Sequence, residues 1–516
     1  MTFRRGRALC AAASALGLVL YLAPPAAAET LADAISLAYT TNPALLAARG
    51  ELRATDERYV QAQAALGPTV TASANGTTDD AAVTQASLLG KPTTKIDHAQ
   101  NYTAEFTARQ PLYDGGQLSA AVAVARAEVL AGRQSLRKTE STVLGDVIAA
   151  YLDVILAREL LEIARQNVEI LADQNAETLA KVKVRDLTIT DQFQSRARLL
   201  AARIRLTQVR SQLTDSESKY LSTVGQFPGE LAPPPDLPGV PPTIDAAFTA
   251  AEQAAPAYLL ARYTELASRA RVREAKGAYG FQVSASFRMA REPVAAYLKR
   301  TEINSSVATV TVTKPIFSSG AQSSRVREAV ETNYSDSLKV DDSHRQTLLG
   351  VAHSWTTLVS ARAILQDLRD QLIAEKEAFD GSKAEQRVGI RSTIDLLNAE
   401  QEYQDTKISL AQKYRDEYIG RANLLEAIGV LTVEMIEPDM ATYQPERSFN
   451  HVMRTQALPW NRLVEAIDSL GEKPLGLQTS SRDPLGAGHM SGLDGMPSAP
   501  SWAELSRILA ELPTRR

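Results

Sequence analysis

Two short stretches of this chain hold the polar residues that could bind an ion or link neighbouring copies. Arg391 lies four residues before Asp395, and Thr190 with Asp191 forms a matching stretch in which Asp191 lies 204 residues before Asp395. Spacing alone favours helix capping, because an acidic side chain complements the positive end of a helix. A second interpretation requires symmetry. In an oligomer of parallel hairpins each inward carboxylate becomes a ring that favours cations, and Arg391 would latch that ring through Thr190 or Asp191 of a neighbouring tip.

The sequence carries no recognisable catalytic or metal-binding pattern. Its five histidines are scattered, and none has a metal-ligand spacing. It has neither a Gly-rich phosphate loop nor a nucleophile elbow. The net charge is −4, and no basic patch is interleaved with aromatic residues, which argues against a nucleic-acid partner. We therefore expect no enzyme, no cofactor and no bound metal.

Each of the two stretches is predicted to be a turn between long helices. Gly389 supplies a permissive backbone, and Ser392 or Thr393 can cap the following helix. Around this turn apolar residues follow a seven-residue period typical of a coiled coil, with Glu417 as the one break. The heptad positions are Val351, Leu358, Leu365, Leu372 and Phe379 before the turn and Leu396, Tyr403, Leu410, Leu424 and Leu431 after it.

The first hairpin is predicted to contain a helix over 117–181, about 100 Å long at 1.5 Å per residue. Eight consecutive heptad positions of this helix, from Val122 to Leu171, hold no polar residue. Its return helix, 190–224, is shorter. We expect each short return helix to be extended by another helix of the same repeat, ending near Ala65 or Lys276 and stacked end to end.

The chain is a duplicated unit. Pro111 and Pro315 lie 204 residues apart, as do Gly225 and Gly429, and a shared offset indicates an internal repeat.

Three arginines before an apolar run predict a signal peptide that contains the only cysteine, Cys10. The expected organisation is a signal peptide over 1–28, a first repeat over 29–226, a Pro-rich linker over 227–242, a second repeat over 243–437 and a mostly disordered tail over 438–516, with amphipathic pieces at 460–470 and 502–512.

Four segments alternate apolar and polar residues and are predicted to be strands. They cover 68–76 and 102–109 in the first repeat, and 281–289 and 308–313 in the second, with a long loop expected over 77–101. The pattern is typical of a barrel with lipid outside and water inside, and the alternative is a soluble two-sided sheet. Four strands cannot close a barrel, and open edges do not occur in lipid, so a membrane location requires oligomerisation.

Proline and glycine mark a joint after each strand pair. Pro111, Gly115 and Gly116 follow the second strand, and Pro315 and Gly320 follow the fourth. We expect each proline to end the strand pairing and each glycine to allow the turn from strand to helix.

In these features the chain resembles the TolC family of outer-membrane exit ducts. The resemblance covers about 29–437 and is carried by the order, duplication and spacing of several motifs. They are 31–35 with Asn42-Pro43, QPLYDGG at 110–116, KPIFSSG at 314–320, RVGIRSTID at 387–395, and 427–429. The resemblance implies a mainly α fold with a small β part, in which three chains form a twelve-stranded transmembrane β-barrel and a long α-helical coiled-coil barrel through the periplasm.

The resemblance also implies roles for residues at the tip. Asp395 matches the first of two aspartates that ring the tunnel entrance, whereas Asn398 stands at the second position, so this entrance should be less acidic. Arg391 matches the arginine that links neighbouring hairpins, with Thr190 and Asp191 on the partner side. Gln386 stands where a tyrosine is usual, which alters that part of the latch.

The function implied by the resemblance is an outer-membrane channel that receives cargo from an inner-membrane transporter of the ABC or RND type through a periplasmic adaptor. We expect type I protein secretion, because the mature chain would lack the cysteine of the lipid-anchored branch. The alternatives are a duct for small-molecule efflux and a soluble periplasmic coiled-coil adaptor. The expected partners are two further copies of the chain, the adaptor, the transporter and outer-membrane lipid.

Overall fold

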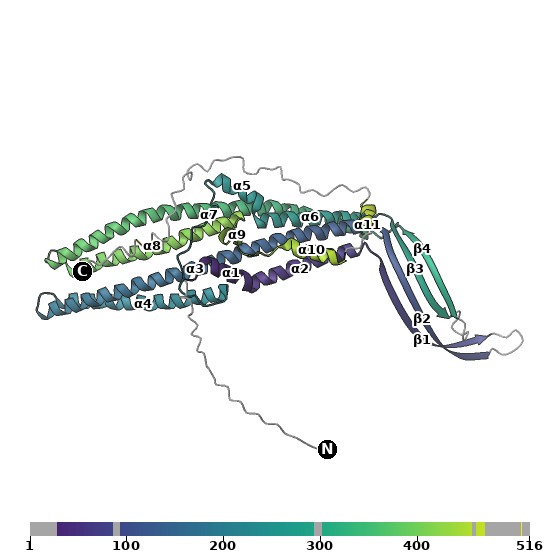
Figure 1. Ribbon diagram of the computed structural model, residues 1–516, viewed down its shortest axis with the longest axis horizontal. Coiled ribbons are helices and arrows are strands. Elements are labelled where there is room, and N and C mark those ends of the chain that lie inside the picture. Colours follow the sequence, from purple (N-terminus) through teal and green to yellow (C-terminus); the bar gives the residue numbers. More distant parts are fainter. Residues whose placement is uncertain (1–27, 86–92, 294–301, 457–460, 470–506, 508–516) are drawn as a thin grey trace, which may run out of the picture.

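A long helical body with a β-sheet at one end makes up the computed structural model (Figure 1). The structure describes residues 28–85, 93–293, 302–456, 461–469 and 507. The expected signal peptide, apart from residue 28, and all of the expected piece at 502–512 except residue 507 lie outside the described residues. None of the described helices is long and apolar enough to cross a membrane.

The duplication predicted from sequence offsets is confirmed by the helices. In the first repeat, α1 (Leu31–Thr41), α2 (Pro43–Ala64), α3 (Gln117–Lys183) and α4 (Ile189–Val224) contain 11, 22, 67 and 36 residues. In the second repeat, α5 (Ile244–Ala254), α6 (Pro256–Gly277), α7 (Ala321–Arg387) and α8 (Thr393–Ile428) have the same four lengths. Each repeat therefore contains one long hairpin, and both hairpins point away from the sheet (Figure 1).

The predicted heptad positions form the core of the hairpins. All eight positions from Val122 to Leu171 on α3 are buried, as are Val351, Leu358, Leu365 and Leu372 on α7. The break at Glu417 is also buried. Its carboxylate accepts hydrogen bonds from Arg362 Nε at 2.8 Å and Arg421 Nε at 2.7 Å, so the charge is paired inside the seam as a buried carboxylate requires.

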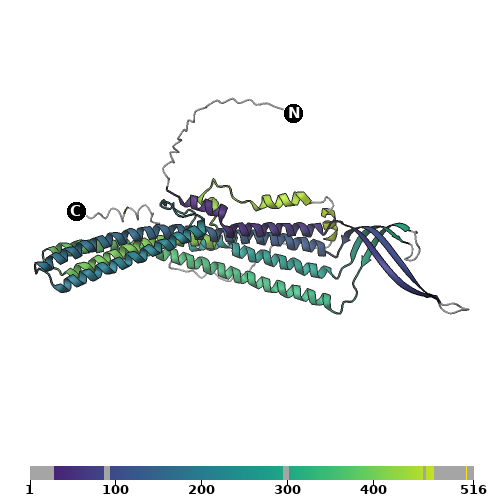
Figure 2. The ribbon, with the colours of Figure 1, turned by 90° about the horizontal axis from the view of Figure 1, so that it is seen from below.

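The end-to-end stacking predicted for the short helices is present in both repeats. Asn42, the N-cap of α2, donates from Nδ2 to the Thr223 carbonyl at the end of α4, at 3.1 Å. In the second repeat, a Cβ added to Gly429 would lie 2.6 Å from Pro256 Cδ, so the end of α8 abuts the start of α6. Each long helix is thus paired along its length by two shorter ones (Figure 2).

The sheet is antiparallel, with strand order β1-β2-β3-β4. The strands are β1 (Thr69–Gln85), β2 (Thr93–Tyr113), β3 (Gln282–Pro293) and β4 (Glu302–Thr313). The prediction of a long loop over 77–101 was wrong, because β1 and β2 remain paired from Thr77↔Asn101 to Gln85↔Thr93. This segment is rich in threonine, which suits strands, but it lacks the alternation of apolar residues on which the prediction depended.

One face of the sheet is apolar across all four strands. Val70 lies opposite Ala108, Ala108 opposite Phe287, and Phe287 opposite Ala308, and opposed residues of neighbouring strands share a face. Val70 is 58% exposed and Phe287 is 41% exposed, so the single chain leaves this face uncovered. The opposite face is polar and carries an ion pair between Glu105 and Arg288 at 3.0 Å.

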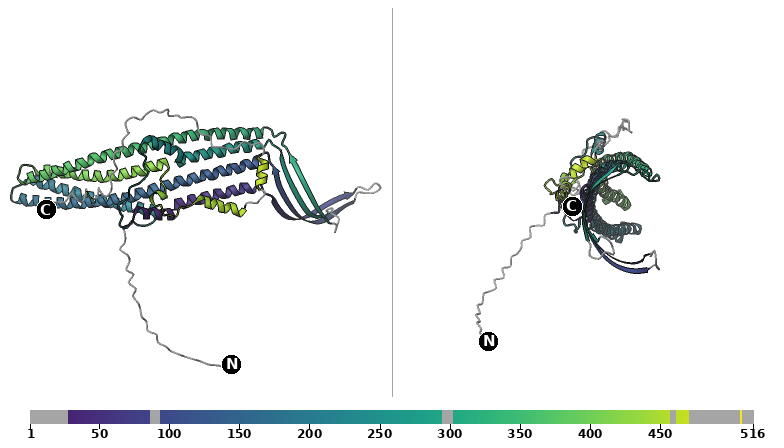
Figure 3. Two further views of the ribbon diagram at one scale, coloured as in Figure 1. Left: turned by 45° about the horizontal axis from the view of Figure 1, so that its top comes forward. Right: turned by 90° about the vertical axis from the view of Figure 1, so that its right-hand side faces the viewer.

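Three further helices follow α8: α9 (Val433–Ile436), α10 (Pro445–Gln456) and α11 (Asn461–Asp468). The position of α11 agrees with the amphipathic piece expected at 460–470. The helix α10 was not predicted, because its apolar residues are few. Both helices pack against the first repeat, and in the view along the long axis they lie on the convex side of the arc formed by the body (Figure 3).

Candidate pore entrance at the helical tips

Both hairpins end in the same backbone turn. At the first tip, Arg185 N donates to the Val182 carbonyl and Asp186 N to the Lys181 carbonyl; at the second, Gly389 and Ile390 make the equivalent bonds. This pattern is the Schellman motif, which requires a residue in the left-handed conformation. Gly389 meets the requirement at φ 78°, whereas the first tip places Arg185 there at φ 64°.

The two aspartates predicted at the tips cap the return helices. Ser392 Oγ donates to Asp395 Oδ2 at 2.6 Å, and Asp395 N donates back to Ser392 Oγ at 3.2 Å. Thr188 and Asp191 form the same capping box at the first tip. The hydrogen bonds from the Ser392 side chain and backbone lower the pKa of Asp395, so this exposed carboxylate is ionised at neutral pH.

Within one chain, Arg391 forms an ion pair with Glu385 of the same hairpin tip. Its Nε lies 2.7 Å from Glu385 Oε2, and both side chains are about half exposed. The structure does not bring Arg391 to Thr190 or Asp191 in the same chain, although both tips lie at the same end of the body (Figure 1). The latch between neighbouring tips therefore stays a prediction about the oligomer.

Asn398 links the two hairpins rather than standing free at the entrance. Its Oδ1 accepts a hydrogen bond from Arg198 on α4 at 2.9 Å, and the same guanidinium contacts Gln401. This link positions α8 against α4 just behind the tips. Arg198 could not be identified from the sequence, because nothing in the local pattern distinguishes it from other surface arginines of α4.

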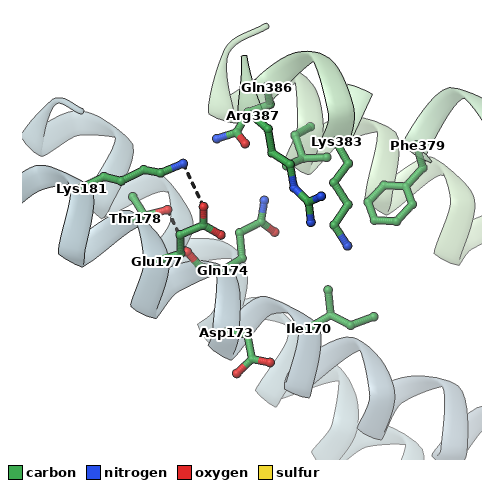
Figure 4. Close-up of a pocket in the computed structure, with 11 residues that line it drawn as sticks. Ile170, Asp173, Gln174, Glu177, Thr178, Lys181, Phe379, Lys383, Gln386 and Arg387 are labelled. Carbon is green, nitrogen blue, oxygen red and sulfur yellow. Dashed lines mark hydrogen bonds and ion pairs between the residues drawn. The ribbon is translucent and has the colours of Figure 1, made fainter. Parts of the chain in front are cut away.

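Gln386 borders a cavity of about 210 Å³ between the long helices α3 and α7 (Figure 4). Asp173 and Glu177 line it from α3, and Lys383 and Arg387 extend into it from α7. The Glu177 carboxylate is held by Lys181 at 2.8 Å. The cavity is thus lined by charges of both signs on α3 and by two basic side chains on α7.

A buried carboxylate behind the second tip was not expected. Glu400 on α8 is 2% exposed, and neither of its carboxylate oxygens has a hydrogen-bond partner among the described residues. Burial raises its pKa to about 7, and the positive charge of Lys383 offsets only part of this effect. No group of three potential metal-ligating side chains lies together in the described part of the chain.

At the other end of the helices, the predicted joints connect strands to helices. Gly116 and Gly320 are the N-caps of α3 and α7, at φ 86° and 83°. The expectation that Pro111 ends the pairing was wrong, because β2 continues to Tyr113 and its register to β3 shifts after Pro111. Pairing with β1 has already ended at Arg109, so the missing N–H is not needed there. Pro315 lies between β4 and α7, as expected.

Known proteins share this arrangement over most of the chain. The family model for outer membrane efflux proteins matches residues 34–225 and 248–430. The chain belongs to this family, which is the TolC family. Because its members are outer-membrane proteins with a periplasmic helical part, the chain has the same location, and the interpretation as a soluble adaptor loses its support.

Relatives at the level of sequence and of structure agree with the family. The outer membrane efflux protein BepC of Brucella suis is 28% identical over 87% of this chain and 96% of its own length. The alkaline protease secretion protein AprF of Pseudomonas aeruginosa is 25% identical over 80% and 87%. The crystal structure of the outer-membrane protein VceC of Vibrio cholerae has a TM-score of 0.67 at 15% identity over 77% of this chain and 96% of that one, which shows a shared fold.

Proposed function

We propose that three copies of this chain form the outer-membrane exit duct of a tripartite export system. The observation that supports the trimer most directly is the four-stranded sheet with an exposed apolar face. Its outer strands, β1 and β4, are each paired on one side only among the described strands, and lipid does not tolerate unpaired backbone groups. Three such sheets joined β4 to β1 close a twelve-stranded barrel around the polar face.

Disulfide cross-linking tests this assembly. The only cysteine, Cys10, lies in the predicted signal peptide, so introduced cysteines would be the only thiols of the mature protein. A scan of cysteine pairs, one along β1 around Thr71 and one along β4 around Thr309, should give covalent trimers after oxidation. Pairs between β1 and β3, which β2 separates inside the chain, are the control. Absence of any β1–β4 cross-link between copies would contradict the trimer.

We further propose that Asp395 forms a ring at the periplasmic entrance and that Arg391 bonds Thr190 or Asp191 of a neighbouring tip. Asp395 is exposed and ionised, and its second oxygen remains available after capping. Arg391 is half exposed, so its guanidinium can reach a neighbour while it bonds Glu385. Opening would separate the tips in an iris-like movement, with the energy supplied by the inner-membrane transporter.

For the cargo, we propose an exported protein, delivered by an inner-membrane transporter of the ABC or RND type and a periplasmic adaptor. The name of AprF, a protease secretion protein, supports this choice, and the alignment with AprF covers 80% of this chain. The second candidate is small-molecule efflux, which the name of the more similar relative BepC favours. Comparing culture-supernatant proteins with and without the gene separates them. Loss of one or a few large secreted proteins supports secretion, and an unchanged supernatant favours efflux.

A further inference from the structure

The strand-to-helix joint of the first repeat is capped by a residue from the C-terminal tail. Asp468, the last residue of α11, is 1% exposed. Its Oδ1 accepts hydrogen bonds from the backbone N–H groups of Asp114 at 2.7 Å and Gly116 at 3.2 Å, and its Oδ2 accepts one from Ser119 at 2.9 Å. The first amides of a helix lack partners within the helix, and the N-cap Gly116 has no side chain to bond them. Asp468 therefore supplies the missing cap of α3.

The helices α10 and α11 lie along the first repeat, between the start of α2 and this joint (Figure 2). Tyr443 N donates to the Tyr39 hydroxyl at 2.9 Å. The ring of Phe449 on α10 lies 5.2 Å from the ring of Tyr59 on α2. On α11, Val464 is 4% exposed and packs in the same apolar cluster as Tyr59. These contacts hold Asp468 in place at the start of α3.

Among the described residues, the joint of the second repeat has no equivalent cap. No side chain of the described residues accepts a hydrogen bond from the backbone N–H groups of 318–323, and the neighbouring Ile316 and Phe317 are 94% and 85% exposed. The first joint, in contrast, is also closed on its other side, where a Cβ added to Gly115 would lie 2.3 Å from the Gly277 carbonyl. Two features therefore distinguish the first joint: the contact with α6 at Gly277 and the cap that Asp468 of the tail supplies.

We propose that the tail segments 443–456 and 461–468 form a clasp that holds the first strand-to-helix joint in one geometry, with Asp468 as its positioning residue. Removing this carboxylate leaves three backbone N–H groups without their acceptor at a largely buried site, which destabilises that conformation. The consequence for transport rests on the proposed duct. Barrel and helical tunnel meet at this joint, so the clasp would set how they align.

Hydrogen–deuterium exchange of the purified full-length protein in detergent tests the clasp. In Asp468→Ala, peptides covering 112–120 should exchange about tenfold faster than in the wild type, as loss of a strong helix cap implies. Asp468→Asn keeps one acceptor oxygen and should give a smaller increase. Asp439→Ala, which changes an exposed carboxylate of the same tail, is the control and should leave 112–120 unchanged.

Two results would overturn the clasp: unchanged exchange of 112–120 in both Asp468 variants, or an equal increase in Asp439→Ala. If Asp468→Ala fails to fold, the comparison of Asp468→Asn with the wild type decides. Peptides at the start of α7, covering 314–324, should not change in any variant, because that joint has no tail cap. Exchange does not depend on transport, so the clasp can stand or fail separately from the proposed duct.

Discussion

The buried Glu400 should make the stability of the second hairpin depend on pH. Its folded-state pKa of about 7 lies above the ordinary value of 4.5 because burial disfavours the charged carboxylate. Between these two values the folded state binds more protons than the unfolded state, so stability falls as pH rises. The contribution of the protonated group is complete below about pH 4.5 and is lost as pH rises to about 7. At 1.36 kcal/mol per pKa unit, the loss is about 3 kcal/mol.

Glu400→Gln tests this value because glutamine resembles the protonated carboxyl and does not titrate. At about pH 8, thermal unfolding followed by the helical circular dichroism signal should show the variant to be more stable by about 3 kcal/mol. At about pH 4.5, the two proteins should nearly coincide. Glu402→Gln, a change at an exposed neighbour, controls for the loss of one charge and should have little effect. Equal stability of Glu400→Gln and wild type at pH 8 would show that the ionised Glu400 carboxylate does not destabilise the folded protein.

Three further changes test the tips. Asp395→Ala should weaken the block of channel current by multivalent cations, measured in planar bilayers, and an unchanged block would remove Asp395 from the constriction. Arg391→Ala should raise the conductance by loosening contacts between tips; conductance equal to that of the wild type would leave Arg391 as a partner of Glu385 only. Arg185→Gly should stabilise the first tip by about 1 kcal/mol in thermal unfolding by relieving the left-handed backbone, whereas Arg185→Lys should give no gain.

The helical architecture could be predicted because its signals are local and periodic. The heptad positions of α3 and α7 predicted the buried seams, and the equal offsets of prolines and glycines predicted the duplication. The lengths of β1 and β2 could not be predicted, since their outer halves lack apolar alternation and pair by backbone hydrogen bonds that every residue except proline can make in full. Backbone pairing with β3 also explains why β2 continues beyond Pro111.

At the site, capping by Ser392 and Asp395 follows from spacing, but the partners of other residues depend on contacts between distant segments. Asp468 caps a helix that begins some 350 residues earlier, and no local pattern indicates this. The sequence shows Glu417 only as a break in the heptads. The structure shows that its buried carboxylate is paired with Arg362 on the facing helix. Arg185 could have been found, because the repeat offset aligns it with Gly389 and so predicts a left-handed backbone.

Single-channel recording of the purified protein in a planar lipid bilayer is the decisive test of the proposed three-chain duct. A duct made of three chains predicts stable, uniform conductance steps that are cation-selective and that appear only with the trimeric fraction from the β1–β4 cross-linked protein. A cross-linked trimer that inserts in the bilayer without any conductance, or uniform steps from a monomeric fraction, would contradict the claim.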